Sequence, residues 1–371
     1  MKQFLIRTTV LMIVVITVCC LSSACAESIS VGDSKTFAVT LTDSPPFKKG
    51  TVLLDNNITL RSHSERALML QIQSLVIDGQ DHALTPGANV SQDDEISLTM
   101  RDKGYLKLQN ISDLGNMSVF GLKGTVEFEN VMLTGNSYTF LNAHATLSSA
   151  DTAVRDKAGK PSSIYVSKTL SSQKPKLVLD ENCRIAENWM LRTVNAELQV
   201  DCDYYDAEVE AFAKGSVSFS GKGIGKGQLS VMMLGEGKAT VNAQTEKLRI
   251  IFSGSDPKGS RTVSVTGSAH SVKIQINEAL QKSRKLNLNL SDVNELRFVI
   301  WLTGEKRDVP VTDKEKEDLH KMMHKAVANM SLKKVKNSDG KPIKNVTYEI
   351  SGQDEKGTSW KEEWTEELNG K

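Results

Sequence analysis

The feature that most constrains the fold of this chain is a local repeat with a period of twenty residues. Residues 106–116, with the sequence LKLQNISDLGN, return as residues 126–136, with the sequence VEFENVMLTGN. Each copy has alternating apolar residues, then Asn, and then Gly-Asn. This order is typical of a strand, a tight turn, a second strand and another turn. The repeat therefore predicts two stacked coils of a β-solenoid.

The repeat has a physical rationale in its apolar and Asn positions. Leu106 and Leu108 should point inward from a strand, and Asn110 and Asn130 should fall at the turn that follows. Asn tolerates the left-handed backbone conformation, and its amide can bond the equivalent Asn of the next coil. We therefore expect these two Asn side chains to stack.

Short alternating apolar runs recur on both sides of the repeat and predict further strands. They cover residues 52–54, 58–60, 75–77, 96–100, 177–179, 198–200, 217–219, 229–232, 248–252, 263–265, 272–276 and 286–290. No amphipathic helix of useful length is expected among them. The spacing becomes irregular beyond residue 140, so a β-sandwich in the second half stays an alternative.

The segment Leu75-Val-Ile-Asp-Gly79, followed by His82-Ala-Leu84, has the form of an earlier coil. With the repeat, it resembles the right-handed parallel β-helix proteins of the pectin-lyase-like superfamily, whose coils often carry Asn at this turn and Gly-Asn soon after. The resemblance spans about residues 50–300 and is sharp over residues 75–136. It implies an all-β, right-handed parallel β-helix solenoid.

The first twenty-six residues have the pattern of a secretory signal. Lys2 and Arg7 precede an apolar run over residues 11–18, and the small-residue segment Ala24-Cys-Ala26 follows. We expect cleavage after Ala26 and a secreted, periplasmic or cell-surface protein without a transmembrane segment in the mature chain. Lipid attachment at Cys25 and an uncleaved anchor are the alternatives.

The charge of the chain is nearly balanced, with 46 basic and 45 acidic residues. Removal of the signal would take away two basic residues and leave the balance almost unchanged. A protein that binds nucleic acid or an anionic membrane usually has a basic excess. Nothing in the composition indicates either partner.

Two cysteines, Cys183 and Cys202, would remain in the mature chain. An even pair in an exported protein predicts a disulfide, and two buried thiols are the alternative. Simple alignment of the neighbouring strands places Cys202 opposite Glu181. A bridge would therefore require a local insertion.

Residues 301–371 differ in composition, with dense and balanced charge. Thr312 and Glu315 form a capping box that predicts a helix, with Leu319 and Met323 on its apolar face. A hairpin is expected around residues 338–340. The predicted organisation is a signal peptide over residues 1–26, a β-helix over 27–300, and a small C-terminal α+β cap or domain over 301–371, which would cover the open end of the solenoid.

The best acidic candidates for chemistry are Asp201, Asp203 and Asp206. On one strand, Asp201 and Asp203 would project outward together and could bind calcium or act as acid and base. The resemblance implies calcium ligands on such a face in the lyases and paired aspartates in the hydrolases. Arg184 and Arg192 could lie one coil away, but no known catalytic motif surrounds them. A solvated acidic strand is the alternative.

Two further motifs have residue types that are found in ligand sites. His320 and His324 have a spacing that can bind zinc, but Lys321 stands where a zinc protease needs Glu. An exposed face with a Glu317–Lys321 pair is the alternative. The Gly-rich stretch 221–227 lacks the Ser or Thr and the helix of a phosphate loop, so it predicts a bulge or tight turn instead.

These observations predict an exported, non-catalytic solenoid that acts as a structural or binding module of the cell surface or envelope, such as an adhesin. Its partner would be a glycan or a surface protein. The alternative is a polysaccharide lyase or glycoside hydrolase that uses Asp201, Asp203 and Asp206. No cofactor is expected, although calcium would accompany the lyase alternative.

Overall fold

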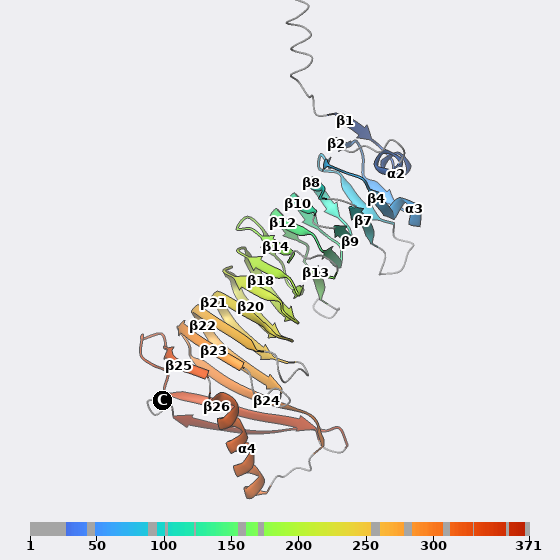
Figure 1. Ribbon diagram of the computed structural model, residues 1–371. Coiled ribbons are helices and arrows are strands. Elements are labelled where there is room, and N and C mark those ends of the chain that lie inside the picture. The colour runs from blue at the N-terminus through green and yellow to red at the C-terminus, as the bar shows by residue number, and fades with distance from the viewer. Residues whose placement is uncertain are drawn as a thin grey trace, which may run out of the picture.

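The computed structural model describes residues 27–42, 49–87, 95–100, 103–121, 124–154, 161–169, 174–253, 260–277, 284–306, 312–328, 330–353 and 356–367. They form an elongated body of stacked coils (Figure 1). The coils pair in parallel from the first to the last, so the predicted parallel β-helix is confirmed. Coils beyond residue 140 continue the same stack, so the β-sandwich alternative is wrong.

Each coil contributes strand segments to three faces of the solenoid. Face 1 stacks β1 (Ser28–Val31), β2 (Lys49–Leu54), β5 (Ser74–Asp78), β8 (Tyr105–Leu114), β10 (Thr125–Leu133), β12 (His144–Thr152), β14 (Lys176–Leu179), β17 (Glu197–Val200), β19 (Ser216–Phe219), β21 (Gly237–Phe252), β22 (Arg261–Asn277), β23 (Arg284–Ser291) and β25 (Met330–Val335). Face 2 is narrow and stacks β3 (Ile58–Leu60), β6 (Ala83–Pro86), the ends of β8, β10 and β12, β15 (Arg184–Ile185) and the starts of β18 (Asp203–Phe212) and β20 (Gly223–Met233).

Face 3 completes each coil. It stacks β4 (Ala67–Leu70), β7 (Ile96–Met100), β9 (Met117–Gly121), β11 (Ser137–Leu141), β13 (Ser162–Ser167), β16 (Trp189–Val194), the later parts of β18, β20, β21 and β22, then β24 (Glu295–Lys306) and β26 (Asn345–Gln353). Alternate residues of every face point inward and form one continuous apolar core.

The predicted asparagine stacking is confirmed at the corner between faces 1 and 2. Leu106 pairs with Val126, which sets the two copies of the repeat in register. Asn110 and Asn130 have φ angles of 54° and 53°, and Nδ2 of Asn130 donates to Oδ1 of Asn110 at 2.9 Å. Nδ2 of Asn110 in turn donates to Oδ1 of Asp78 at 3.1 Å. The ladder thus extends over three coils.

The N-terminal end of the core is closed by a helix that the sequence analysis did not predict. β1 pairs with β2, and α2 (Ser34–Thr42) lies between them in sequence. Phe37 and Leu41 of α2 are buried in the core. The backbone N–H of Thr36 donates to Oδ1 of Asp33 at 2.9 Å, which caps the helix start. A second, one-turn helix, α3 (His63–Arg66), follows β3.

The C-terminal end carries the predicted helix, α4 (Asp313–Val327). Its capping box between Thr312 and Glu315 is present, and Leu319 and Met323 are buried. The predicted hairpin around residues 338–340 is present as a short one, in which Lys336 and Pro342 form an antiparallel bridge and the N–H of Asn337 donates to the carbonyl of Lys341 at 2.8 Å. It does not extend further, because β25 and β26 on either side pair with β23 and β24. A longer hairpin joins β26 to β27 (Ser359–Glu367), antiparallel.

Candidate functional site

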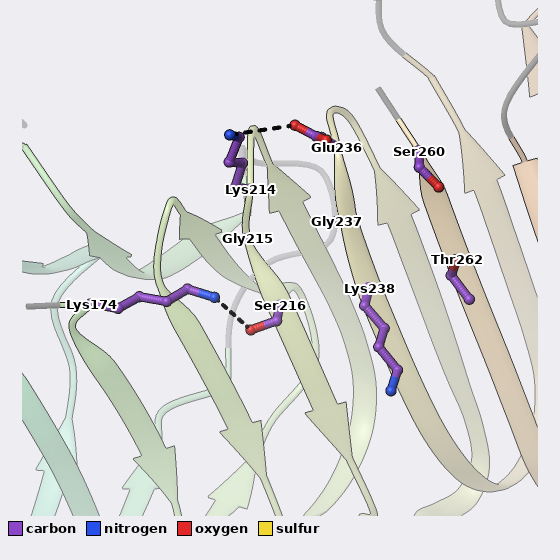
Figure 2. A pocket seen from close by; sticks show the side chains of 9 residues that line it. All are labelled: Lys174, Lys214, Gly215, Ser216, Glu236, Gly237, Lys238, Ser260 and Thr262. Carbon is purple, nitrogen blue, oxygen red and sulfur yellow. Dashed lines mark hydrogen bonds and ion pairs between the residues drawn. The ribbon is translucent and has the colours of Figure 1, made fainter. Parts of the chain in front are cut away.

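A groove crosses the start of β19, β21 and β22, where the chain turns from face 3 into face 1 (Figure 2). We call it the lysine groove, after Lys174, Lys214 and Lys238 in its lining. It has a volume of about 370 Å³, and the described residues of its lining include one acidic residue, Glu236. With three lysines and one glutamate, the described part of the lining has a positive net charge.

The groove is built on a corner where two successive coils carry Gly. A Cβ on Gly237 would lie 2.3 Å from the carbonyl oxygen of Gly215, so the two coils approach too closely there for a side chain. Ser216, Ser260 and Thr262 complete the wall with hydroxyl groups. The corner therefore offers a positively charged, hydroxyl-lined surface, and no aromatic ring is part of its lining.

The lysines of the groove differ in their partners. Nζ of Lys174 lies 3.2 Å from Oγ of Ser216, to which it donates, and 3.5 Å from Glu197. Nζ of Lys214 lies 3.9 Å from Glu236. Lys238 is exposed, and among the described residues no acidic side chain pairs with it (Figure 2). This lysine is available to a ligand.

Face 1 beyond the groove is covered with small polar side chains. Register places Ser218, Thr240, Ser264 and Asn287 in one outward column, with a neighbour about 4.8 Å away on each adjacent coil. Columns of hydroxyl and amide groups at this spacing present repeated hydrogen-bonding groups. The groove and this column form a continuous polar surface.

Sequence reasoning missed the lysine groove because its residues come from coils of different length. The signal in the sequence is a Gly at the start of each of two successive strands, in Lys214-Gly-Ser216 and in Glu236-Gly-Lys238. The register of β19 with β21 shows that these two segments lie side by side.

The structure does not bring Asp201, Asp203 and Asp206 together. Asp201 follows β17 on face 1, where it accepts hydrogen bonds from Ser220 and Gln199, each at 2.5 Å. Asp203 begins the face 2 part of β18, and its Oδ1 accepts a hydrogen bond from the backbone N–H of Lys222 on the next coil at 3.3 Å. Asp206 lies at the entry to face 3. The expectation that Asp201 and Asp203 share one face is wrong, because the chain bends between them.

Asp206 lines a second cavity, of about 250 Å³, together with Glu208 and the buried Trp189. Burial raises the pKa of Glu208, and the nearby Glu210 adds to this effect. Glu210 itself is paired with Arg192 on the adjacent coil. Arg192 is therefore engaged away from the three aspartates.

No family model, curated protein or solved structure matches this chain. Within the described residues, no group of three or more His, Cys, Asp or Glu side chains is arranged to hold a metal ion. No helix in the described parts of the chain combines the length and apolar character needed to cross a membrane.

The two cysteines lie on adjacent coils, and the required local insertion is present. Leu179 pairs with Val200, whereas Arg184 pairs with Asp203, so the earlier coil has two more residues between these pairs. This shift places Cys183 opposite Cys202. Both are buried free thiols, so the predicted disulfide is not formed in this structure. Burial raises the pKa of Cys183 to about 12.

The two histidines of α4 contact the C-terminal hairpin. The ring of His320 stacks on that of Trp364, with ring centroids 3.7 Å apart. Nε2 of His324 lies 3.1 Å from Glu366. The Glu317–Lys321 pair on the exposed side of the helix is confirmed at 2.8 Å.

The Gly-rich stretch 221–227 forms the predicted bulge. Tyr204 pairs with Gly223 and Asp206 pairs with Gln228, so the later coil has three more residues between these pairs. Gly225 has a φ of +64° and nothing near its Cβ position. The stretch is a turn of the solenoid at the corner between faces 2 and 3.

Proposed function

We propose that this protein is an exported, non-catalytic structural and binding module of the cell surface or envelope, similar to an adhesin, and that its lysine groove binds an acidic glycan. The groove carries the proposal because it joins a lysine that no described acidic side chain pairs with, two further lysines and several hydroxyl groups to a polar face of stacked strands. A sugar polymer offers hydroxyl groups to such a face, and its acidic groups would pair with the lysines. Membership of the pectin-lyase-like superfamily is part of this proposal, and the sequence resemblance of the coils over residues 75–136 supports it.

The test is the binding of residues 27–371 to dextran sulfate, with uncharged dextran as the matched ligand. Binding should be selective for dextran sulfate and should weaken with salt, because the lysines are exposed and screened. The double variant Lys214→Gln/Lys238→Gln should lose about tenfold in affinity, since each exposed charge contact contributes about 0.5–1 kcal/mol.

The matched control is Lys103→Gln/Lys247→Gln, which removes the same charge from exposed positions outside the groove. An equal loss of affinity in both double variants would show a general charge effect and would refute the groove. Binding of plain dextran with equal affinity would refute selectivity for acidic groups.

The envelope role has its own test in cell fractionation. Membrane or wall association that survives high salt supports a structural role, and a product that is entirely soluble contradicts it. Labelling with a radioactive fatty acid would reveal lipid attachment at Cys25, the alternative mode of processing.

One observation favours a second candidate function, that of a glycoside hydrolase or polysaccharide lyase. Asp206 and Glu208 both line the second cavity, and burial holds the pKa of Glu208 above its ordinary value, as general acids require. Two residues along a strand separate their Cα atoms by about 6.6 Å. Turnover of an acidic or neutral polysaccharide that Glu208→Gln abolishes, but Asp203→Asn leaves intact, would establish this site. The absence of turnover from folded protein would leave the binding proposal.

A further inference from the structure

Beyond the lysine groove, the two next coils carry Arg at the corner position where the earlier coils carry Gly. Gly237 pairs with Arg261, and Arg261 pairs with Arg284. Arg261 is 1% exposed and Arg284 is 8% exposed. Adjacent coils lie about 4.8 Å apart, so two guanidinium groups of like charge emerge from neighbouring positions in a buried corner.

The buried charge of Arg284 is costly without a counter-charge. A buried guanidinium needs an opposite charge or a full set of hydrogen bonds. Nη1 of Arg284 is buried and has no hydrogen-bond partner among the described residues. Burial lowers the pKa of Arg284 to about 10, and the positive charge of Arg261 adds to this effect. No acidic side chain in the described parts of the chain forms an ion pair with Arg284.

We infer that Arg284 binds an oxyanion, such as a phosphate, sulfate or carboxylate group, with the positive charge of Arg261 behind it. A guanidinium presents planar pairs of N–H donors that match two oxygens of such a group. The residues on either side of Arg261, Ser260 and Thr262, line the lysine groove, whereas Arg261 and Arg284 are not among the described residues of its lining. The anion can be free in solution or part of a polymer. The site does not depend on glycan binding by the groove.

A purely structural role for Arg284 makes the opposite prediction about stability. If the side chain only fills the corner, anions should not affect it specifically. If it binds an oxyanion, the free protein contains an uncompensated charge, and anion binding stabilises the folded state by mass action. The dependence of stability on anion concentration therefore distinguishes a structural role of Arg284 from oxyanion binding.

The experiment measures the thermal unfolding midpoint of residues 27–371 in inorganic phosphate, with sodium chloride at matched ionic strength as reference. Phosphate also stabilises proteins non-specifically, with an effect that does not saturate, so the readout is the saturable part at millimolar concentration. The wild type should show a saturable rise of the midpoint. Arg284→Met should lack it and, in chloride alone, should be at least as stable as the wild type.

The control is Lys285→Met, which removes the same charge from the exposed neighbouring position and should keep the saturable response. Arg284→Lys keeps the charge without the paired donors and should bind phosphate about tenfold more weakly, which provides a test if the Met variant does not fold. A wild type without a saturable response, or an Arg284→Met variant that retains it, would overturn the inference.

Polymer-borne anions are distinguished from free ones by competition between dextran sulfate and phosphate. Competition that disappears in Arg284→Met supports a polymer-borne group at this site, and phosphate binding without competition supports a free anion. If Lys214→Gln/Lys238→Gln loses dextran sulfate binding but keeps the phosphate response, the groove and the arginine site act separately. Loss of the phosphate response in that double variant would contradict the assignment of the site to Arg284.

Discussion

The early coils and the late coils of the solenoid close their corners by different chemistry. Over residues 105–141 the corners are held by side chains, through the Asn110–Asn130 ladder and through Oδ1 of Asn116, which accepts from the N–H of Ser137 at 3.2 Å. In the late coils, β21 and β22 run for 16 and 17 residues and pair over nearly their whole length. The corner of β22 is formed by Gly267, with a φ of 110°, and the paired position of β21 is Ala243.

The comparison shows that parallel stacking does not depend on one kind of corner. The inward apolar columns are common to both regions and supply the burial that drives folding. The corner only has to turn the chain, either with Asn, which tolerates a left-handed φ and bonds its neighbour, or with Gly, which needs no partner. The early corner should therefore respond to loss of a hydrogen bond, and the late corner to added volume.

The largest effect is expected at the late corner. A Cβ on Gly267 would lie 1.9 Å from the carbonyl oxygen of Ala243, in a backbone conformation that other residues avoid. Gly267→Ala should lower the free energy of unfolding by about 3 kcal/mol, since backbone strain and overpacking each cost about 1–3 kcal/mol. Urea denaturation of the two proteins measures the difference.

Gly225→Ala is the matched control, because Gly225 has a φ of +64° but nothing within 4 Å of its Cβ position. This variant should lower the free energy of unfolding only by the cost of the left-handed backbone conformation, about 1 kcal/mol. Equal losses at both positions would mean that close contact between late coils contributes nothing, and the distinction between the two corners would fail.

The comparison also explains which parts of the fold could be predicted from the sequence. The Asn110–Asn130 stacking was predictable because a side chain at the early corner marks the register. The lysine groove was not, because its residues are brought together by coils of unequal length. α2 was missed because its three buried residues, Phe37, Ala38 and Leu41, lie among Ser and Thr that give no clear helical pattern.

The same limit applies to the candidate site. Asp201 and Asp203 were expected on one face because alternation was extended through a position where the chain bends. For Cys183 and Cys202 simple alignment placed the two residues apart, but an insertion in the earlier coil sets them opposite each other. Local alternation predicts the strands, but corners and insertions decide which residues meet.

A second prediction concerns these cysteines, which lie between the two regions. Oxidation with oxidised glutathione should join Cys183 to Cys202, because facing Cα atoms on adjacent strands are about 4.8 Å apart, within the range of disulfides. The bridge closes a loop of about twenty residues and should stabilise the fold by about 3 kcal/mol. Intact mass and thiol counts identify the bridge, and thermal unfolding measures its effect.

Cys202→Ala serves as the control, since it should show no oxidant-dependent change in stability. Two titratable thiols in oxidised, unfolded wild-type protein would contradict the predicted bridge. A bridge that forms without raising the unfolding midpoint would show that unfolding begins outside this coil, either in the early or in the late region.

The third prediction tests the early corner. Asn130→Gly keeps the freedom to adopt a positive φ but removes the amide bond to Asn110, whereas Asn130→Ala removes both. Asn130→Gly should lower the free energy of unfolding by about 1 kcal/mol, the usual net value of a hydrogen bond. Asn130→Ala should lower it by about 1 kcal/mol more, because Ala resists the left-handed backbone conformation. Denaturation of the two variants separates the contributions. An Ala variant as stable as the Gly variant would mean that the ladder, and not the backbone conformation, determines the corner.

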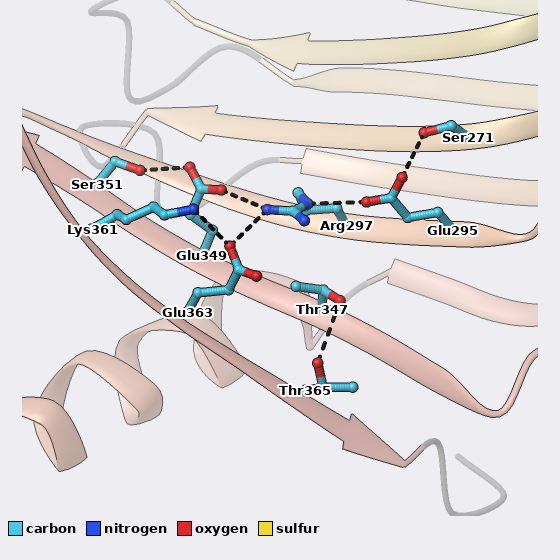
Figure 3. Close-up of polar contacts among 9 residues, drawn as sticks. All are labelled: Ser271, Glu295, Arg297, Thr347, Glu349, Ser351, Lys361, Glu363 and Thr365. Carbon is cyan, nitrogen blue, oxygen red and sulfur yellow. Dashed lines mark hydrogen bonds and ion pairs between the residues drawn. The ribbon is translucent and has the colours of Figure 1, made fainter.

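The smallest effect is expected at the C-terminal end, where side chains again join the strands. Arg297 of β24 lies 2.9 Å from both Glu349 of β26 and Glu363 of β27 (Figure 3). Burial acts against the charge of Glu349, but hydrogen bonds from Ser351 and Arg297 outweigh it and lower its pKa. The pKa of Glu363 is lowered chiefly by its hydrogen bond from Lys361, with Arg297 contributing.

Lowered carboxylate pKa values stabilise the folded state above the unfolded Glu value of 4.5, and this contribution is lost as pH falls through the folded values. Arg297→Gln should therefore lower stability by about 1 kcal/mol at pH 7 and reduce the loss of stability on going to acidic pH. Lys238→Gln removes a charge that has no carboxylate partner among the described residues, and it should leave the pH profile unchanged. If Arg297→Gln retained the full acid dependence, these carboxylates would not hold the terminal strands, and the late region would rest on glycine corners and apolar columns alone.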